Sequence, residues 1–138
     1  YKILGLDKEW TGGNMKIGMG GGMKINLLRD EIKDYNDEDI ILFTDSYDTI
    51  FLTDEKEILE KYNNLNCDIL FSGEEICWPN ESLSYIFEDT DYKYKYINSG
   101  GFISKISSLK LLLSEQIKDN NDDQLYMHLR YKELKNII

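Results

Sequence analysis

The chain has few cysteines, a deficit of basic residues and no long apolar run. Cys67 and Cys77 are its only cysteines, too few for a disulfide framework and without a second pair to complete a metal-binding motif. The cysteine content therefore does not distinguish an oxidising from a reducing compartment. No apolar stretch is long enough to span a bilayer, and the first residues lack the basic-then-apolar pattern of a signal peptide. We expect no membrane span.

Acidic residues outnumber basic ones by 26 to 16, which gives a formal net charge of −10 at pH 7. Nucleic-acid phosphates would be repelled by this charge, so we expect no general affinity for DNA or RNA. A nucleotide diphosphate is not excluded, because a bound cation can invert the local field. The length of 138 residues is enough to bury one modest core, which favours a single domain.

The segment 40–48 carries the strongest functional signal. Its apolar run Ile40–Phe43 is typical of a buried strand and is followed by Asp45 and Asp48. Acids at the carboxyl end of such a strand lie at the sheet edge where open α/β sheets bind ligands. Two carboxylates directed to one point suit Mn²⁺ or Mg²⁺, which can hold a diphosphate. The alternative is that Asp45 caps the next turn and Asp48 is solvated.

The hydrophobic pattern of the sequence predicts strands that alternate with helices. A helical face is predicted over 23–32, and a second helix begins after the cap residue Asp54 and ends at 63–64. A short strand is predicted over 68–72, and residues 1–6 read as a further strand. This alternation predicts an α/β fold with a mostly parallel sheet.

Glycines 20–22 open the first predicted helix. Glycine lets backbone N–H groups approach an anion at a helix N-terminus, although consecutive glycines are also typical of a flexible connector. Lys24 lies in the first turn, where its charge opposes the helix dipole. We therefore expect Lys24 to contact a phosphate or a sugar.

Two loop residues are candidates for sugar contacts. Trp78 precedes Pro79 in a loop, where its flat ring suits a sugar face, although a loop aromatic that folds onto the core is equally compatible with the sequence. Asn98 is followed by Gly100 and Gly101, which allow the backbone close to a ligand. Asn98 would then donate to or accept from a sugar hydroxyl.

Tyrosines at 92, 94 and 96 alternate with Lys93 and Lys95. Such alternation occurs in segments that bind single-stranded nucleic acid, and also in half-exposed edge strands, where lysine discourages edge-to-edge pairing. The acidic total favours the edge strand. Asp119, Asp122 and Asp123 begin the last predicted helix. Capping explains one or two of them, but it does not require Asp122 and Asp123 side by side.

These segments together resemble the glycosyltransferase domain of procollagen lysyl hydroxylases. The likeness covers nearly the whole chain in the same order and is carried by Leu4–Leu6, Trp10–Gly13, Gly20–Lys24, Phe43–Asp48, Leu70–Glu74, Cys77–Pro79, Asn98–Ile103 and Asp122–Leu125. Each segment alone is weak; their shared order is strong.

The resemblance implies one nucleotide-sugar transferase domain over 1–138, with an α/β, GT-A-like fold whose mostly parallel mixed sheet is flanked by helices. It implies an anomer-retaining transfer of glucose from UDP-glucose to galactosyl-hydroxylysine of collagen, with Mn²⁺ or alternatively Mg²⁺. It also implies the endoplasmic reticulum lumen and allows a homo-oligomer. Two alternatives stay open: a hydroxylysine galactosyltransferase that uses UDP-galactose, and a non-catalytic sugar-nucleotide-binding or scaffold domain.

The resemblance also assigns roles to single residues. Metal binding is assigned to Asp45 and Asp48, contacts to the rest of the nucleotide sugar to Lys24, Ser46 and Gly100, and a place at the transferred sugar to Trp78, Asn98, Asp122 and Asp123. Family members have a strand before and a histidine metal ligand after the matched region, so we expect this chain to miss both. His128 is therefore predicted to be a partly exposed helical residue and not a ligand.

The chain departs from the family pattern at three positions. Asn120 and Asn121 interrupt a run of aspartates, and Leu27 stands where relatives often place a tryptophan near the acceptor. These differences leave the acceptor preference open and are the features that favour a scaffold.

Overall fold

The computed structural model describes residues 1–14, 16, 18–47 and 49–135. Its helices are α1 (Gly22–Glu31), α2 (Glu55–Leu65), α3 (Ile106–Leu112) and α4 (Asp123–Leu134), with 3-10 turns η1 (Ile32–Asp34) and η2 (Glu81–Ile86). Its strands are β1 (Ile40–Thr44), β2 (Ile69–Glu74) and β3 (Tyr96–Lys105). Within the described part of the chain, no helix is both long and apolar enough to cross a membrane.

The strands form one sheet in the order β1-β3-β2, and both pairings are antiparallel. The α/β class is therefore confirmed, but the mostly parallel sheet is not found among the described residues. Alternation along the chain correctly places β1 and β2 in the same direction, since each runs opposite to β3. It does not reveal that β3 inserts between them and supplies the hydrogen bonds of both. The carboxyl ends of β1 and β2 consequently lie toward the same edge of the sheet.

Local sequence signals account for the ends of α2. The Asp54 side chain accepts a hydrogen bond from the backbone N–H of Glu57 at 3.0 Å, as the predicted cap requires. The helix continues to Leu65 and stops at Asn66, whose φ of 49° is left-handed. The predicted end at 63–64 is thus early, because asparagine tolerates this conformation at the residue that closes a helix.

Two strand predictions are wrong. Residues 1–6 form no strand but enter a turn in which the N–H of Lys8 donates to the carbonyl of Gly5. The tyrosine-lysine alternation does not form an edge strand before Tyr96, where β3 begins, and Tyr92 and Tyr94 are exposed. Neither segment has a partner strand to satisfy its backbone, and period-two patterning alone cannot provide one.

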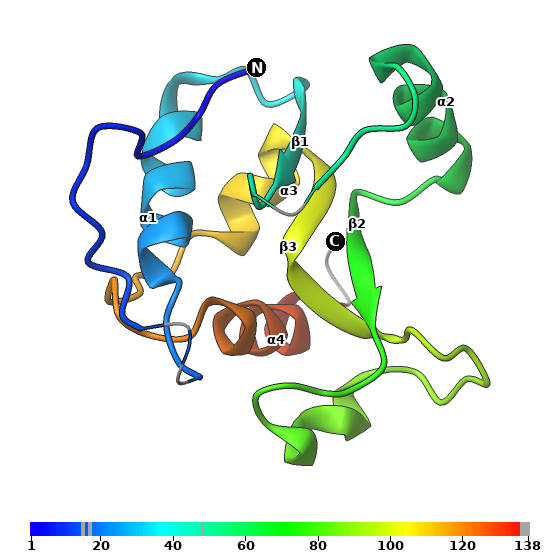
Figure 1. Ribbon diagram of the computed structural model, residues 1–138. Helices are drawn as coiled ribbons and strands as arrows, with labels where there is room; N and C mark the ends of the chain where they lie inside the picture. Colours follow the sequence, from blue (N-terminus) through cyan, green and yellow to red (C-terminus); the bar gives the residue numbers. More distant parts are fainter. Residues whose placement is uncertain (15, 17, 48, 136–138) are drawn as a thin grey trace.

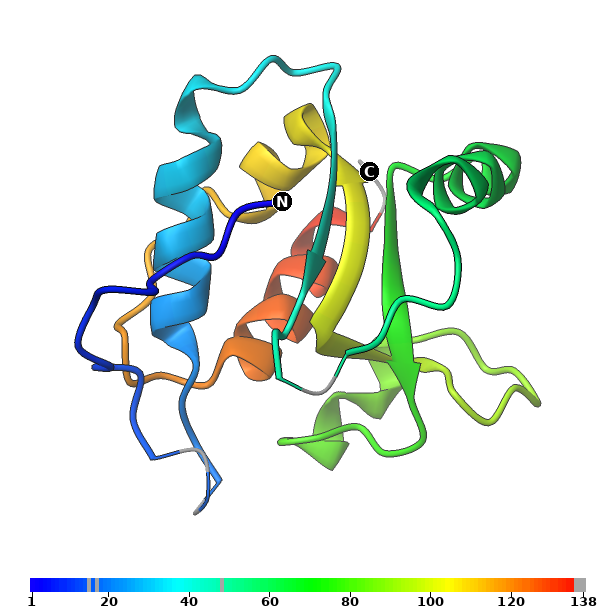
Figure 2. The same cartoon turned by 45° about the horizontal axis from the view of Figure 1, so that its top comes forward.

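The core lies between one face of the sheet and helices α1, α3 and α4. It is built from buried side chains that include Ile25, Leu28, Phe102, Leu109 and Met127. In Figures 1 and 2, α1 lies at one side of the molecule and α2 stands at the other, beyond β2. The first turn of α1 and the start of α4 both face the lower end of β1 and the bend of β3, where the site described below is formed.

A bulge in β3 shapes that end of the sheet. Phe71 lies opposite Phe102, but the next residue of β2, Ser72, lies opposite Asn98. Residues 99–101 therefore have no counterpart in β2, and Gly101 pairs instead with Thr44 of β1. Bulges of this kind bend a strand and redirect its side chains, and they are common beside active sites.

The glycines at the start of α1 are part of the packed structure and not a flexible connector. Gly20, Gly21 and Gly22 are all buried. The N–H of Gly22 donates to Asn121 O at 2.9 Å and that of Met23 to Asp119 O at 3.0 Å. These N–H groups already have carbonyl partners, so an anion at this helix start would have to displace them. The starts of α1 and α4 are instead bonded to each other.

Gly22→Ala should destabilise the fold by about 2 kcal/mol, as overpacking typically does. A Cβ at this position would lie closer to the Lys118 carbonyl oxygen than Cβ atoms come to any neighbour in real structures. Because the oxygen belongs to the backbone, it cannot move aside as the end of a flexible side chain can. Urea unfolding followed by circular dichroism measures the change. Ser107→Ala, an exposed position of α3, is the control and should shift the unfolding free energy by less than about 0.5 kcal/mol. Equal stability of both variants would contradict the close contact.

Candidate functional site

A cleft of about 640 Å³ opens where the β3 bulge, the end of β1 and the starts of α1 and α4 converge. Ligand sites are typically clefts of this size, lined by apolar groups with a few placed polar ones. Its described lining includes most of the site residues singled out from the sequence, namely Lys24, Asp45, Trp78, Asn98, Gly100, Asp122 and Asp123.

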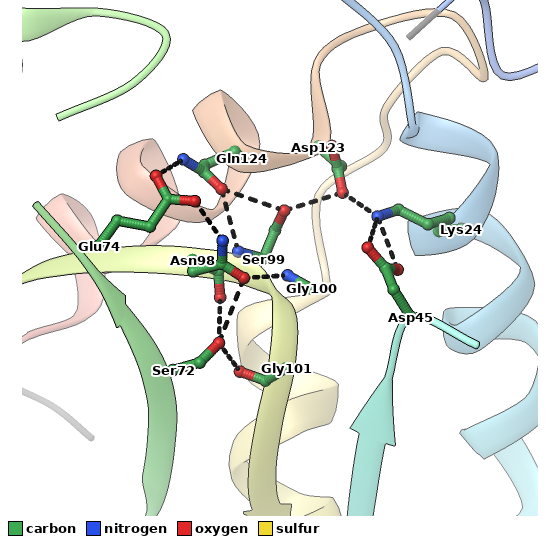
Figure 3. Close-up of polar contacts among 10 residues, drawn as sticks. All are labelled: Lys24, Asp45, Ser72, Glu74, Asn98, Ser99, Gly100, Gly101, Asp123 and Gln124. Atoms are coloured by element: carbon green, nitrogen blue, oxygen red, sulfur yellow. Dashed lines mark hydrogen bonds and ion pairs between the residues drawn. The ribbon is translucent and has the colours of Figure 1, made fainter. Parts of the chain in front are cut away.

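Lys24 lies between two carboxylates in this cleft (Figure 3). Its Nζ is 2.9 Å from Asp45 Oδ1 and 2.8 Å from Asp123 Oδ2. Asp45 follows β1, Lys24 belongs to the first turn of α1, and Asp123 is the first residue of α4. Three elements far apart in sequence thus bring one ammonium and two carboxylates together.

The environment keeps Lys24 charged. Burial opposes the charge of its ammonium group, but Asp123 and Asp45 outweigh that cost and the pKa of Lys24 is raised above its usual value. Asp123 is the deeper of the two carboxylates, with a side chain 5% exposed against 34% for Asp45. Lys24 was expected to contact a phosphate or sugar, and in this structure it pairs with the acids that line the same cleft.

A glycine beside Asp45 avoids a close approach. A Cβ on Gly100 would lie 3.0 Å from Asp45 Oδ2 and 3.0 Å from Asn98 Oδ1. The Gly100 carbonyl also accepts a hydrogen bond of 2.8 Å from the N–H of Asp45. The bulge therefore brings the β3 backbone close to the end of β1, and a side chain at Gly100 would force Asp45 or Asn98 to shift.

A second polar network holds Asn98 in the bulge (Figure 3). Its Oδ1 accepts from the N–H of Gly100 at 2.8 Å and from Ser72 Oγ at 3.2 Å. Its Nδ2 donates to Glu74 Oε1. The amide is thus oriented on both sides, and Glu74 connects it to the end of β2.

Gln124 extends this network to the Trp78 loop, which we define as residues 76–80. Its Nε2 donates to Glu74 Oε2 and to the Trp78 carbonyl, each at 3.0 Å. Its Oε1 accepts from the Ser99 N–H at 3.2 Å, while Ser99 Oγ donates to Asp123 Oδ2 at 2.9 Å. The loop, the bulge and the start of α4 are therefore joined by continuous hydrogen bonds.

Trp78 lies at the rim of the cleft and does not fold into the core. Its side chain is 50% exposed. Its Cζ2 lies 3.9 Å from the position that a Cβ on Gly18 would take, so the ring faces the glycine-rich segment. A flat ring in this position is accessible to a ligand in the cleft.

The aspartates around the start of α4 have separate roles. Asp122 caps the helix by accepting a 2.7 Å hydrogen bond from the N–H of Leu125, and burial raises its pKa. Asp119 accepts from Thr11 Oγ1 and from Asn26 Nδ2, each at 2.6 Å, and these bonds lower its pKa. Capping fully accounts for the hydrogen bond of Asp122, whereas Asp123 is turned to Lys24 and Ser99.

The predicted metal pair is described only in part. Asp45 lines the cleft, but Asp48 lies outside the described residues, and Ser46 is exposed just beyond β1. Among the residues that the structure describes, no three His, Cys, Asp or Glu side chains are grouped closely enough to hold a metal ion. Carboxylate oxygen remains the donor chemistry that Mn²⁺ and Mg²⁺ require, and Asp45 supplies it at the cleft surface.

His128 was expected to be partly exposed, and this is wrong. Its side chain is 0% exposed, and Nε2 lies 3.0 Å from the Ile97 carbonyl oxygen. The prediction followed only from the absence of a ligand role, although the neighbours Met127 and Leu129 are apolar. The backbone of β3 supplies the partner that makes burial of the ring acceptable.

Sequence reasoning did not single out Ser72, Ser99 and Gln124 as site residues. All three line the cleft. Ser99 lies inside the Asn-Ser-Gly-Gly segment and Gln124 follows the two aspartates, so motif membership was the available signal. Glu74 ends the segment Leu70–Glu74, but its partners on β3 and α4 depend on tertiary packing.

Comparison with known proteins now identifies the family. The model of the PLOD GT domain family matches residues 1–136. The chain belongs to this family. It is 47% identical over 126 residues to a procollagen-lysine,2-oxoglutarate 5-dioxygenase of Drosophila melanogaster, covering 89% of the chain and 17% of that protein.

Other relatives of this PLOD GT domain confirm the match. The chain is 36% identical over 128 residues to the human multifunctional procollagen lysine hydroxylase and glycosyltransferase, covering 91% of the chain and 17% of that protein. It is 39% identical over 140 residues to an uncharacterized protein of Acanthamoeba polyphaga mimivirus, covering 100% of the chain and 31% of that protein. The chain thus spans less than a third of the length of each relative.

Proposed function

We propose that this PLOD GT domain transfers glucose from UDP-glucose to the galactose of galactosyl-hydroxylysine in collagen, with retention of the anomeric configuration. The observation that supports this most is the convergence of Lys24, Asp45 and Asp123 in one cleft of a domain from this family. The cleft combines a carboxylate suited to a divalent cation, which would hold the diphosphate, with groups suited to a sugar. The net charge of −10 also favours a basic collagen segment as acceptor.

Asp45, together with Asp48, would hold the divalent cation of the donor complex. A partly exposed carboxylate at the carboxyl end of β1 fits a hard cation. When bound, Mn²⁺ or Mg²⁺ would neutralise the charge that develops on the diphosphate as UDP leaves. Lys24 lies 2.9 Å from Asp45 and would add its own positive charge beside the leaving group, while Ser46 and Gly100 would contact the rest of the nucleotide sugar.

Trp78, Asn98, Asp122 and Asp123 would act on the transferred sugar. The Trp78 ring would stack on the sugar face, and Asn98, oriented by Glu74 and Gly100, would present its amide to a hydroxyl. Asp123 would balance the positive charge that develops at the anomeric carbon. No side chain is assigned as a nucleophile, and an oxygen of the leaving diphosphate would accept the proton of the acceptor hydroxyl.

The test is a transfer assay of the full-length protein with UDP-glucose and UDP-galactose. Deglucosylated collagen peptide and peptide with bare hydroxylysine serve as acceptors, with and without Mn²⁺. Glucose transfer to galactosyl-hydroxylysine supports the proposal. Galactose transfer to bare hydroxylysine would replace it with the galactosyltransferase. If the protein binds UDP but produces no UDP from either UDP-sugar with any acceptor, it is instead a scaffold. The departures from the family pattern at Asn120, Asn121 and Leu27 favour that outcome.

Trp78→Ala should lower glucose transfer by about thirtyfold, the effect of losing roughly 2 kcal/mol of transition-state contact. Its half-exposed ring contributes little to the core, so the fold should remain stable. UDP affinity, measured by isothermal titration, should stay within about twofold of the parent because UDP lacks the sugar. Trp10→Phe, which changes the other tryptophan at a comparably exposed position, is the matched control. Normal transfer by Trp78→Ala would remove Trp78 from the sugar site.

A further inference from the structure

The Trp78 loop is fastened to α4 at two points one helical turn apart. Gln124 Nε2 donates to the Trp78 carbonyl at 3.0 Å, and His128 Nδ1 lies 3.9 Å from Cys77 Sγ. Residues four apart lie on one face of a helix. The same face of α4 therefore contacts both Cys77 and Trp78.

The hydrogen positions on His128 follow from its two neighbours. The Ile97 carbonyl accepts only, so Nε2, at 3.0 Å from it, carries the hydrogen. In the neutral ring Nδ1 is then an acceptor, and the thiol of Cys77 is the group that faces it. Burial, followed by the charge of Glu81, raises the pKa of Cys77, which keeps the thiol protonated as a donor. The thiol also donates to the Asn80 carbonyl at 3.4 Å, so its single hydrogen is shared between this carbonyl and His128 Nδ1.

The loop depends on these contacts because its apolar packing is local. Cys77, Leu83 and Ile86 form a small buried cluster separate from the main core. Phe87 packs against this cluster and places its ring edge-on to His128, with centroids 5.1 Å apart. Together with Gln124, His128 is thus a buried polar contact between the loop, β3 and α4.

We propose that His128 is a positioning residue of the sugar site, which acts through Cys77 to hold the Trp78 ring in place at the rim of the cleft. This proposal rests on the proposed function in one respect: the proposed function identifies the ligand of Trp78 as the transferred sugar. α4 then supplies three groups to the site: Asp123 contacts Lys24, Gln124 bonds Glu74 and the loop backbone, and His128 contacts Cys77 of the loop.

Two substitutions separate the contacts of the ring. Asparagine places its amide near Nδ1 and keeps an acceptor for Cys77, whereas glutamine places its amide near Nε2 and keeps a donor for Ile97. His128→Gln should lower kcat for glucose transfer by about ten- to a hundredfold, as misplacement of a site group does. Its UDP affinity should stay within about twofold of the parent, because the diphosphate contacts are unchanged. His128→Asn should keep most of the transfer activity.

Trp78 fluorescence gives a readout that does not depend on activity. Residues 1–138 contain two tryptophans, so in a Trp10→Phe background Trp78 is the only one within them. His128→Gln should increase acrylamide quenching of Trp78 and shift its emission to the red. Met127→Ala is the control. Met127 is fully buried in the main core on the same helix and is not part of the loop cluster. The substitution should lower stability but leave the quenching of Trp78 unchanged in the folded protein.

Two substitutions of Cys77 test the same contact from the thiol side. Cys77→Ser keeps a donor for His128 and should quench like the parent, whereas Cys77→Val removes it and should behave like His128→Gln. Parent-like quenching in both His128→Gln and Cys77→Val overturns the proposal. If the parent protein transfers no sugar, the proposed function fails, while the quenching series still decides whether His128 positions Trp78.

Discussion

Asp45→Asn should abolish the Mn²⁺-dependent part of UDP binding and lower glucose transfer by about two to three orders of magnitude. The amide keeps the shape of the side chain but loses the charge that a cation needs. Lys24 would retain Asp123 as a partner at 2.8 Å, and the Asp45 carboxylate is one-third exposed. The loss of stability should therefore stay below about 1 kcal/mol. Isothermal titration of UDP with and without Mn²⁺ measures the binding.

Asp37→Asn is the matched control for this substitution. Asp37 also pairs with a lysine, Lys110, at 2.8 Å, but on the surface away from the cleft. It should match the parent in both UDP binding and transfer. A wild-type metal dependence of UDP binding in Asp45→Asn would refute the metal role of Asp45. Asp48→Asn, outside the described residues, is expected to behave like Asp45→Asn.

Asp123→Ala should lower glucose transfer by roughly thirty- to a thousandfold, which corresponds to about 2–4 kcal/mol of lost transition-state stabilisation. Its carboxylate is buried and directed to Lys24, where the sugar would lie next to the diphosphate. Both kcat and kcat/KM should fall, whereas UDP affinity should change little, because the contact is made mainly in the transition state.

The same substitution also removes structural contacts, and these need a separate control. Without Asp123, Ser99 Oγ loses its 2.9 Å partner and Lys24 keeps only Asp45, at a cost of about 1–3 kcal/mol. Asp54→Ala removes the cap of α2, far from the cleft, and should cost about 1 kcal/mol while leaving transfer intact. Near-normal transfer by Asp123→Ala would show that the Asp123 carboxylate only bonds Lys24 and Ser99 and has no role at the transferred sugar.

The site residues were predictable one at a time, but their contacts were not. Motif membership identified Lys24, Asp45, Trp78, Asn98 and Asp123, and all five line the cleft. Their roles remain predictions. The ion pairs of Lys24 join residues 21 and 99 positions away along the chain, and no local pattern encodes such a meeting. The bulge that brings Asn98 to Ser72 likewise depends on how β3 pairs with both of its neighbours.

The sequence by itself determined the family, the α/β class, the strand at 40–44 and the capped start of α2, because each depends on residues close together or on an ordered set of short motifs. Only the tertiary structure decided that β3 lies between β1 and β2, that residues 1–6 form no strand, and that His128 is buried against Ile97. Strand pairing and burial are set by partners distant in sequence. A backbone hydrogen bond or a buried imidazole is stable only when such a partner is present.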